Sequence, residues 1–135
     1  MVIGLGTDIV EIDRVRAALR AQPRLAARLF TPEERAYCDR RADPAPHYAA
    51  RFAAKEAVAK AVGRHLHWQE VSITSGPEGR PGLVLTGESA RWAGVTRGAS
   101  FLLSLSHSRD YATATVLLLA PPGPGQDEFS PRVRV

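Results

Sequence analysis

The sequence predicts an α+β fold in which a long central helix packs on an antiparallel sheet. Three observations lead to this prediction. Helical spacing of apolar residues dominates the first half of the 135-residue chain, strand-like alternation dominates the second half, and the two do not alternate as in a parallel α/β fold. The length suits one domain, which we assign to residues 1–119, followed by a Pro- and Gly-rich tail at 120–135.

Each expected element has a local signal. The first strand is apolar, which is typical of a short buried strand, and its two glycines would allow another backbone to approach closely. Pro23 divides the next helical stretch in two, Thr31 begins a helix with a capping box, and Gly63 ends the main helix. The expected elements are a strand at 1–10, helices at 11–22, 23–30, 31–40 and 46–63, strands at 68–75 and 83–86, a helix at 87–98, and a hairpin within 100–119.

Composition narrows the class of protein. The chain has no run of about 20 apolar residues that could cross a bilayer, and its N-terminus does not have the pattern of a signal peptide. The single cysteine, Cys38, excludes an internal disulfide and disfavours a cysteine-based zinc site. We therefore expect a cytoplasmic protein. The net charge of +4 points to an anionic partner, such as nucleic acid, a membrane, a phosphorylated ligand or an acidic protein.

The basic charge is concentrated near the N-terminus, where four arginines recur at every fourth position. On a single helix they would line one face, and the two shorter helices separated by Pro23 would still each be basic on one side. The pattern alone favours a solvated face over a binding face. The arginines of this stretch are Arg14, Arg16, Arg20, Arg24 and Arg28.

The main helix carries both lysines of the chain, Lys55 and Lys60. Each of the remaining Lys or Arg residues is an arginine. Lysine is a compact point charge that suits a phosphate site. The simplest interpretation of Glu56 and Lys60 is an ion pair between residues four apart on a helix. Arg51 and Lys55 form a like-charge pair on another side, which an anion between them would make favourable.

Two further residues point to a site. Asp8 and His107 each stand at the end of an expected strand, where functional side chains are often presented. Two carboxylates from separate elements, Asp8 and Glu56, can hold a Mg²⁺ that takes its other ligands from water and phosphate. Lys60 would reach the same phosphates, and His107 could bind phosphate or transfer a proton. Taken alone, His107 fits a packing role equally well.

Three segments are similar to the signature blocks of a known family. They are "GTDIVEIDRV" near the N-terminus, "RFAAKEAVAKAVG" in the middle and "LSLSHSRDYATATV" near the end. In order and spacing they resemble the holo-acyl-carrier-protein synthase family, the small bacterial 4′-phosphopantetheinyl transferases. "GRPGLVL" resembles the turn and strand that this family has between its second and third blocks. The resemblance covers roughly residues 1–119 and implies the fold of the family.

The resemblance implies transfer of 4′-phosphopantetheine from coenzyme A to a serine hydroxyl of apo-acyl carrier protein. The other product is adenosine 3′,5′-bisphosphate, and Mg²⁺ is required. The metal ligands implied are Asp8 and Glu56, and Lys60 is the implied contact to the pyrophosphate. We accordingly expect both Lys55 and Lys60 to face phosphates beside the metal.

The resemblance also implies residues that bind coenzyme A. Arg51 and His107 fall at positions associated with its phosphates, and Ser106 and Ser108 flank the histidine and could bind the same ligand. The sequence leaves open which group accepts the serine proton. Glu56, directly or through a metal-bound water, is our first choice, and His107 is the second.

The family further implies partners. It forms homotrimers with sites between subunits, and it docks the acidic acyl carrier protein through the region of the basic helices. Arg14 matches the docking position of the family, whereas Arg20 and Arg24 are assigned by spacing only. Opposite charge is well suited to steering such a partner. Carriers of fatty-acid and polyketide pathways are not distinguished, and we expect neither nucleic acid nor a membrane as partner.

Two other functions fit less of the chain. A nucleic-acid-binding module would use the arginine face, but it predicts aromatic residues among the basic ones, and only Phe30 lies at the end of that stretch. A Mg²⁺-dependent nuclease could use Asp8, Glu56 and Lys60. This nuclease is the alternative chemistry for the same three residues.

Overall fold

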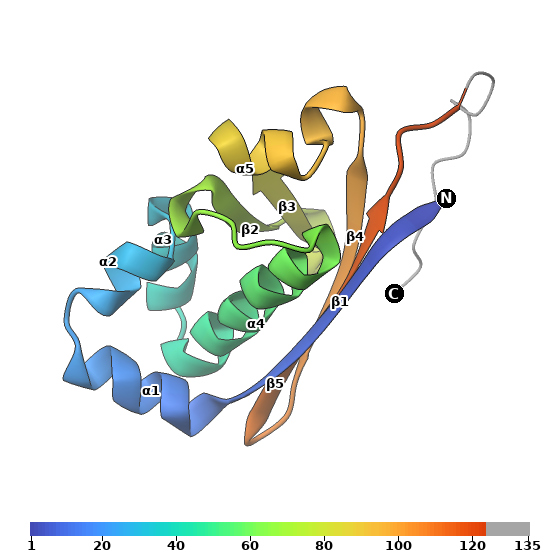
Figure 1. Ribbon diagram of the computed structural model, residues 1–135. Helices are drawn as coiled ribbons and strands as arrows, with labels where there is room; N and C mark the ends of the chain where they lie inside the picture. The colour runs from blue at the N-terminus through green and yellow to red at the C-terminus, as the bar shows by residue number, and fades with distance from the viewer. Residues whose placement is uncertain (124–135) are drawn as a thin grey trace.

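A computed structural model describes residues 1–123, and its elements follow the predicted order (Figure 1). The tail predicted at 120–135 falls mostly outside the described residues, so the domain boundary stays a prediction. Residue 120 still contacts the fold, since its backbone N–H donates to the carbonyl of Met1 at 2.9 Å. The elements are β1 (Val2–Glu11), α1 (Ile12–Ala21), α2 (Leu25–Leu29), α3 (Pro32–Asp39), α4 (Pro44–Val62), β2 (Val71–Ser75), β3 (Pro81–Leu85), α5 (Gly87–Trp92), β4 (Ser100–His107) and β5 (Tyr111–Leu119).

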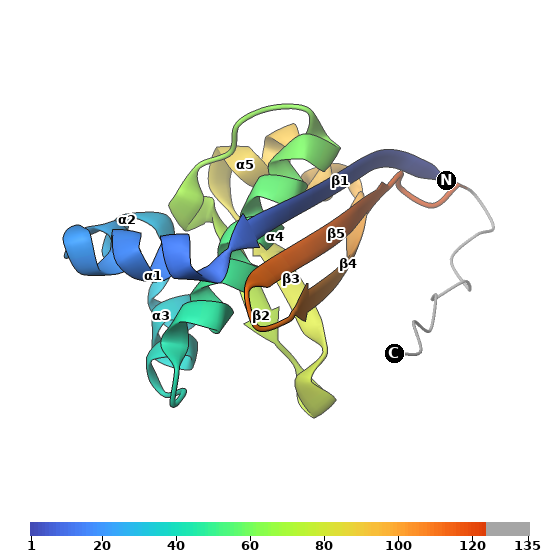
Figure 2. The same cartoon turned by 90° about the horizontal axis from the view of Figure 1, so that it is seen from below.

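The strands form two antiparallel sheets, one ordered β1-β5-β4 and the other β2-β3. The predicted α+β class and antiparallel pairing are confirmed. The first strand of the chain pairs with the last one described, so that Asp8 lies opposite Ala114, and Ala114 lies opposite Leu105 of β4. Figures 1 and 2 show α4 lying along one face of the larger sheet.

The close packing of α4 on β1 depends on small residues from both elements. The buried side of α4 is rich in alanine, including Ala57 and Ala61. A Cβ added at Gly6 would overlap the carbonyl oxygen of Ala57, and one added at Gly4 would overlap that of Ala61. The close approach expected of the two glycines is therefore confirmed. The helix begins two residues before the predicted start and ends at Gly63, whose φ of 89° is left-handed.

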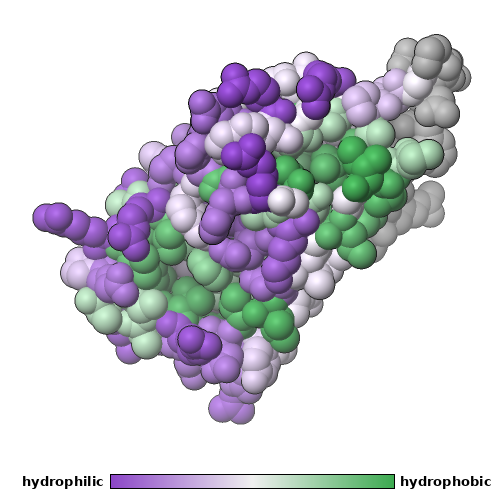
Figure 3. All heavy atoms as spheres, viewed as in Figure 1, coloured by the Kyte–Doolittle hydropathy of each residue, from purple (hydrophilic) through white to green (hydrophobic). Residues whose placement is uncertain are grey.

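The prediction that the first strand is buried is wrong for one of its faces. Alternate residues of a strand point to opposite faces, and α4 covers only the face that carries Gly6. On the other face Ile3, Leu5 and Ile9 are 56%, 63% and 60% exposed. Figure 3 shows hydrophobic residues gathered over the N-terminal half of β1. We call this apolar surface the outer sheet face; it comprises Ile3, Leu5, Ile9, Leu102, Tyr111 and Leu117.

The three helices before α4 pack beside it, away from β4 and β5 (Figure 2). The predicted break at Pro23 is confirmed, because α1 ends at Ala21 and α2 begins at Leu25. The capping box at the start of α3 is present, with the Thr31 hydroxyl accepting from the Glu34 N–H and the Glu34 carboxylate accepting from the Thr31 N–H. No helix within residues 1–123 is long and apolar enough to span a membrane.

Candidate active site

Asp8 and Lys60 meet where β1 passes α4. The Lys60 ammonium donates to Oδ1 of Asp8 at 3.2 Å and to the carbonyl oxygen of Thr7 at 3.0 Å. The Asp8 side chain is 18% exposed and that of Lys60 is 54% exposed. Asp8 points toward α4 because it lies on the same face of the sheet as Gly6. The contact of Gly6 with the helix sets the distance between β1 and α4. The predicted convergence of these two residues is thus present in the structure.

Glu56 stands one helical turn before Lys60 on the same side of α4. The simple ion pair between these two residues is not formed, because Lys60 turns to β1 instead. Within residues 1–123, Glu56 has neither an ion-pair nor a hydrogen-bond partner, and it lines a small hollow with Ala59 and His65. Its carboxylate oxygens are therefore available to a ligand.

The donor set fits the predicted Mg²⁺. No group of three or more His, Cys, Asp or Glu side chains in the described part of the chain is arranged to hold a metal ion. A Mg²⁺ bound largely by water and phosphate needs only one or two protein carboxylates. Asp8 keeps its second oxygen outside the Lys60 contact, and Glu56 is unpaired among the described residues. Hard oxygen donors of this kind suit Mg²⁺.

Arg51 and His107 belong to a second group, which we call the His–Arg cluster. The His107 ring lies 5.8 Å from that of His47, and the His47 ring lies 6.0 Å from that of Tyr37. The guanidinium groups of Arg41 and Arg51 lie 4.1 Å and 4.0 Å from the centre of the Tyr37 ring. Arg51 is 4% exposed, and its Nε has no hydrogen-bond partner within residues 1–123.

The charge of the His–Arg cluster alters two of its members. Burial lowers the pKa of His47, and the neighbouring His107, Arg41 and Arg51 lower it further. A hydrogen bond with Ser75 lowers the pKa of Tyr37, and the two guanidinium groups act in the same direction. A cluster with this excess of positive charge favours an anion.

Sequence reasoning missed three members of the His–Arg cluster, namely Tyr37, Arg41 and His47. A signal existed for His47, because it lies four residues before Arg51 and therefore on the same side of α4. Tyr37 and Arg41 come from α3 and the loop after it, and their approach depends on how α3 packs on α4.

The two groups lie on different sides of α4. At about 100° per residue, Glu56 is about 140° around the helix from Arg51 and about 180° from His47. Lys60 contacts β1, whereas Arg51 contacts Tyr37 of α3. The structure therefore brings Asp8 and Lys60 together, with Glu56 one helical turn from Lys60. It links Arg51 to His107 only through Tyr37 and His47, and it places this cluster on a different side of α4 from Lys60.

The two serines beside His107 differ from it in position. Ser106 precedes His107 on β4 and so faces the opposite side of the sheet. The hydroxyl of Ser108 accepts from the N–H of Tyr111 at 3.4 Å and helps to close the turn between β4 and β5. Their role in binding coenzyme A stays a prediction, and within one chain Ser106 does not share a surface with His107.

The expectation that Lys55 faces a phosphate is wrong. Its side chain is 1% exposed and forms an ion pair with Glu34 at 2.6 Å. It also donates to the carbonyl oxygens of Leu29 at 2.7 Å and Trp68 at 2.9 Å. Burial lowers the pKa of Lys55, and the Glu34 carboxylate opposes that shift. Lysine is needed here for an internal contact, as a long side chain with three donors.

The basic residues assigned to a partner are on the surface. Arg14 and Arg20 are exposed on α1, and Arg24 is exposed just before α2. Arg16 differs, because it forms two hydrogen bonds to Asp43 at 2.6 Å and 3.1 Å and ties α1 to the loop before α4. The exposed arginines of the basic face are therefore the three assigned to carrier binding, together with Arg28.

The fold and these groups agree with one class of protein. Residues 4–116 match the model of the 4′-phosphopantetheinyl transferase superfamily. Because this match spans most of the sequence, the chain belongs to that superfamily.

Within it, the chain is similar to proteins called holo-[acyl-carrier-protein] synthase. One from Syntrophotalea carbinolica is 50% identical over 119 residues, which cover 84% of this chain and 93% of that protein. The Neisseria meningitidis enzyme structure has a TM-score of 0.81 at 30% identity and covers 89% of this chain and 100% of that one. A Bacillus anthracis synthase in complex with CoA (3′,5′-ADP) has a TM-score of 0.75 at 29% identity, covering 89% and 98%.

Proposed function

We propose that this protein transfers 4′-phosphopantetheine from coenzyme A to a serine of apo-acyl carrier protein. The serine oxygen forms a bond to the β-phosphorus of coenzyme A, the bond from that phosphorus to the bridging oxygen breaks, and adenosine 3′,5′-bisphosphate leaves. The observation that carries the proposal is the Lys60 ammonium held on Asp8 one helical turn from an unpaired Glu56. The similarity to enzymes named for this activity supports it.

The residues of the chain have distinct roles in this reaction. Phosphoryl transfer depends mainly on positioning and on neutralising charge at the phosphate oxygens. Asp8 and Glu56 would hold Mg²⁺, which supplies positive charge to the diphosphate when bound. Lys60 is exposed enough to contact the same diphosphate. Glu56 is our first choice to accept the serine proton, because its carboxylate has no partner among the described residues.

The His–Arg cluster is suited to the remaining phosphate of coenzyme A. Arg51 has a buried Nε with no partner in the described part of the chain, and the exposed His107 joins the same cluster through the ring of His47. In one chain this cluster is on a different side of α4 from Lys60, which contacts β1, whereas Arg51 contacts α3. We propose that the site forms between two subunits, with the cluster of one subunit facing Lys60 of another.

A homotrimer built through the outer sheet face would provide such sites. Its exposed leucine and isoleucine side chains are apolar area that association would remove from water. A Leu5→Arg variant should sediment as a monomer and lose transfer while keeping its secondary structure. A wild-type protein that sediments as a monomer while active would contradict the shared site.

Complementation tests the shared site more sharply. Lys60→Ala and Arg51→Ala each damage one half of it, so either variant alone should be nearly inactive. If the halves come from different subunits, refolding the two variants together should restore part of the activity, because some interfaces then carry two intact halves. No recovery in mixtures that do form mixed trimers would place both halves in one subunit.

The reaction itself is tested by intact-mass spectrometry. Apo-acyl carrier protein, coenzyme A and Mg²⁺ are incubated with the protein, with a matched sample that contains EDTA. A gain of one phosphopantetheine that EDTA abolishes would support both the transfer and its metal dependence. No gain on carriers of fatty-acid or polyketide type would refute the function, and cleavage of DNA under the same conditions would favour the nuclease instead.

Carrier docking and location complete the proposal. We assign Arg14, Arg20 and Arg24 to the acidic carrier because they are exposed and close together in sequence on α1 and the start of α2. Replacing each with Glu should raise the KM for the carrier and leave the KM for coenzyme A unchanged. We also propose a cytoplasmic location, with which the free thiol of Cys38 is consistent.

A further inference from the structure

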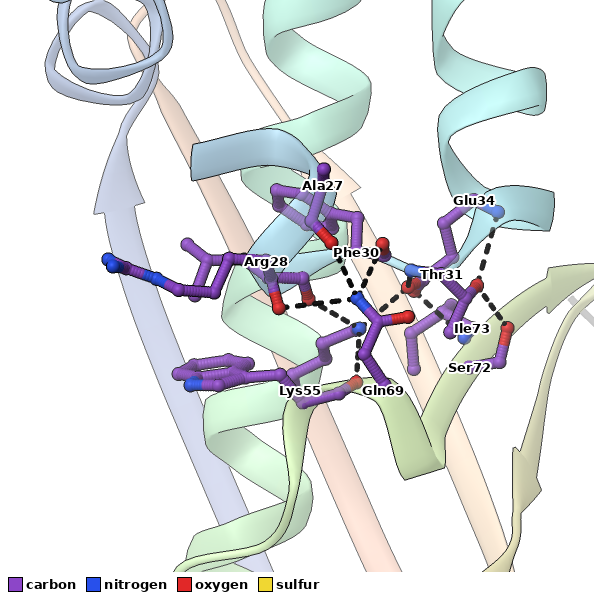
Figure 4. A network of polar contacts seen from close by, with 11 residues as sticks. Ala27, Arg28, Phe30, Thr31, Glu34, Lys55, Gln69, Ser72 and Ile73 are labelled. Atoms are coloured by element: carbon purple, nitrogen blue, oxygen red, sulfur yellow. Dashed lines mark hydrogen bonds and ion pairs between the residues drawn. The ribbon is translucent and has the colours of Figure 1, made fainter. Parts of the chain in front are cut away.

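The short helix α2 ends in four consecutive carbonyl groups that two side chains bind. The last carbonyls of any helix have no partner within it. Here the Gln69 amide nitrogen donates to the carbonyls of Ala27 at 2.9 Å, Arg28 at 3.2 Å and Phe30 at 2.9 Å. Lys55 takes the fourth, that of Leu29. Figure 4 shows both side chains reaching this end of the helix.

These two side chains are themselves fixed to the core. The Lys55 ammonium is paired with Glu34, and the other oxygen of Glu34 accepts from the N–H of Ile73 on β2 at 3.0 Å. Gln69 lies in the turn before β2, and the ring of its neighbour Trp68 stacks on Phe52 of α4 at 5.7 Å. The end of α2 is therefore held by Lys55 of α4 and by Gln69 from the turn before β2, and Glu34 of α3 fixes the lysine in turn.

The helix held in this way carries part of the basic face. Arg24 stands immediately before α2 and Arg28 lies in its last turn, and both are exposed. A helix of five residues is not stable alone in water, because nucleation is unfavourable and few bonds follow it. The position of Arg24 and Arg28 relative to α1 therefore depends on contacts of α2 with the rest of the fold, which are the packing of Ala26 and Leu29 on the core and the hydrogen bonds at the end of the helix.

We propose that Gln69 is a positioning residue for the carrier protein. By binding the carbonyls at the end of α2, it holds Arg24 and Arg28 where an acidic partner meets them together with the arginines of α1. It acts through these arginines and does not touch either substrate. This inference rests on the proposed function, because that function supplies the acidic partner.

The test compares wild type with Gln69→Ala and with Gln69→Glu, which keeps the length but removes the donors. Both variants should raise the KM for the carrier about fivefold to tenfold, with kcat and the KM for coenzyme A unchanged. Amide hydrogen exchange over residues 24–30 should become faster. In an Arg24→Ala/Arg28→Ala background, Gln69→Ala should have no further effect on the carrier KM, since the arginines through which it acts are gone.

The neighbouring residue supplies a matched control. The Glu70 carboxylate accepts from the N–H groups of Glu88 and Ser89 at the start of α5, another short helix, which carries none of the assigned arginines. Glu70→Ala should speed exchange in α5 and leave the carrier KM unchanged.

The outcomes separate this inference from the function beneath it. An unchanged carrier KM in the Gln69 variants, with transfer intact, would overturn the inference alone. So would an equal rise in the KM values for carrier and coenzyme A, or an equal effect of Glu70→Ala, because each indicates general loosening of the fold. Absence of transfer by the wild-type protein would overturn both.

Discussion

The ammonium of Lys60 lies 3.2 Å from Oδ1 of Asp8, across the junction of α4 and β1. The simplest interpretation of the sequence paired this lysine with Glu56 on its own helix. Pairing it with Asp8 instead leaves Glu56 without a partner among the described residues. The junction thus holds one ion pair, and a second, unpaired carboxylate stands one helical turn away on α4.

This geometry predicts that Lys60→Ala lowers turnover far more than stability. An ion pair this exposed contributes about 0–1 kcal/mol to the free energy of unfolding. Because we propose that Lys60 contacts the reacting phosphates, removing its charge should lower kcat by a factor on the order of 10² to 10³. Urea unfolding and steady-state transfer assays measure the two effects. Parallel losses of both would return Lys60 to a structural role.

Lys55→Met should have the opposite profile. Removing one partner of a buried ion pair costs about 3–5 kcal/mol, since the charge of Glu34 is left uncompensated. Lys60→Met is the matched control, being the same change in the same helix at an exposed position, and should cost less than about 1 kcal/mol. Glu34→Gln combined with Lys55→Met should cost less than the sum of the single changes. Urea unfolding that finds the two lysine variants equally stable would contradict this account.

Gly6→Ala should displace Asp8 by forcing β1 away from α4. The added Cβ would lie 2.8 Å from the carbonyl carbon of Ala57, which is backbone and cannot rotate aside. We expect a loss of several kcal/mol, comparable to overpacking a core. The control is Gly79→Ala, where a φ of 74° is the only obstacle and about 1 kcal/mol is expected. Thermal unfolding of both variants measures the two losses. Equal losses would show that the cost at Gly6 comes from the backbone freedom of glycine and not from steric overlap.

His47 should make stability depend on pH. Its pKa is lowered in the fold by burial and by His107, Arg41 and Arg51, while Asp43 acts in the opposite direction. Between its folded pKa and the ordinary value of about 6.5, the unfolded chain binds more protons, so the free energy of unfolding falls as the pH falls through this window. The loss ends below the folded pKa, where both states are protonated.

The measurement is urea unfolding of wild type and His47→Gln between about pH 7.5 and about pH 5. As the pH is lowered, the free energy of unfolding should fall more for the wild type than for the variant, which lacks the titrating imidazole. A difference that stays constant over this range would show that His47 does not titrate differently in the fold.

The sequence predicted those features that local patterns encode. The capping box at Thr31, the break at Pro23 and the end of α4 at Gly63 each depend on a few neighbouring residues, and all are present. The sequence predicted that Asp8 and Lys60 share one site, because Asp8 stands at the end of a strand and because the family resemblance assigns Asp8 to the metal and Lys60 to the pyrophosphate. Lys55 was misplaced because a charged residue next to Glu56 gives no local sign of its own burial.

What escaped prediction depends on long-range packing. Glu34 was identified as a capping residue, but its pairing with Lys55 follows from the contact of α3 with α4. The same contact places Tyr37 against Arg51. The separation of the site into two groups follows from which sides of α4 are covered by β1 and by α3. A helical pattern shows that two residues lie on different sides of a helix but not what faces each one.

The pairing of β1 with β5 affects the order in which the chain can fold. The hydroxyl of Thr7 donates to the carbonyl of Ala114 at 3.1 Å, across 107 positions of sequence. During synthesis on the ribosome β1 emerges before the other strands described, yet the strand that completes it emerges only after α4 and β4. Until then its edge is unpaired and its apolar face is open to aggregation. Asp8, made before the rest of the sheet, can take its place in the folded protein only when β5 has left the exit tunnel.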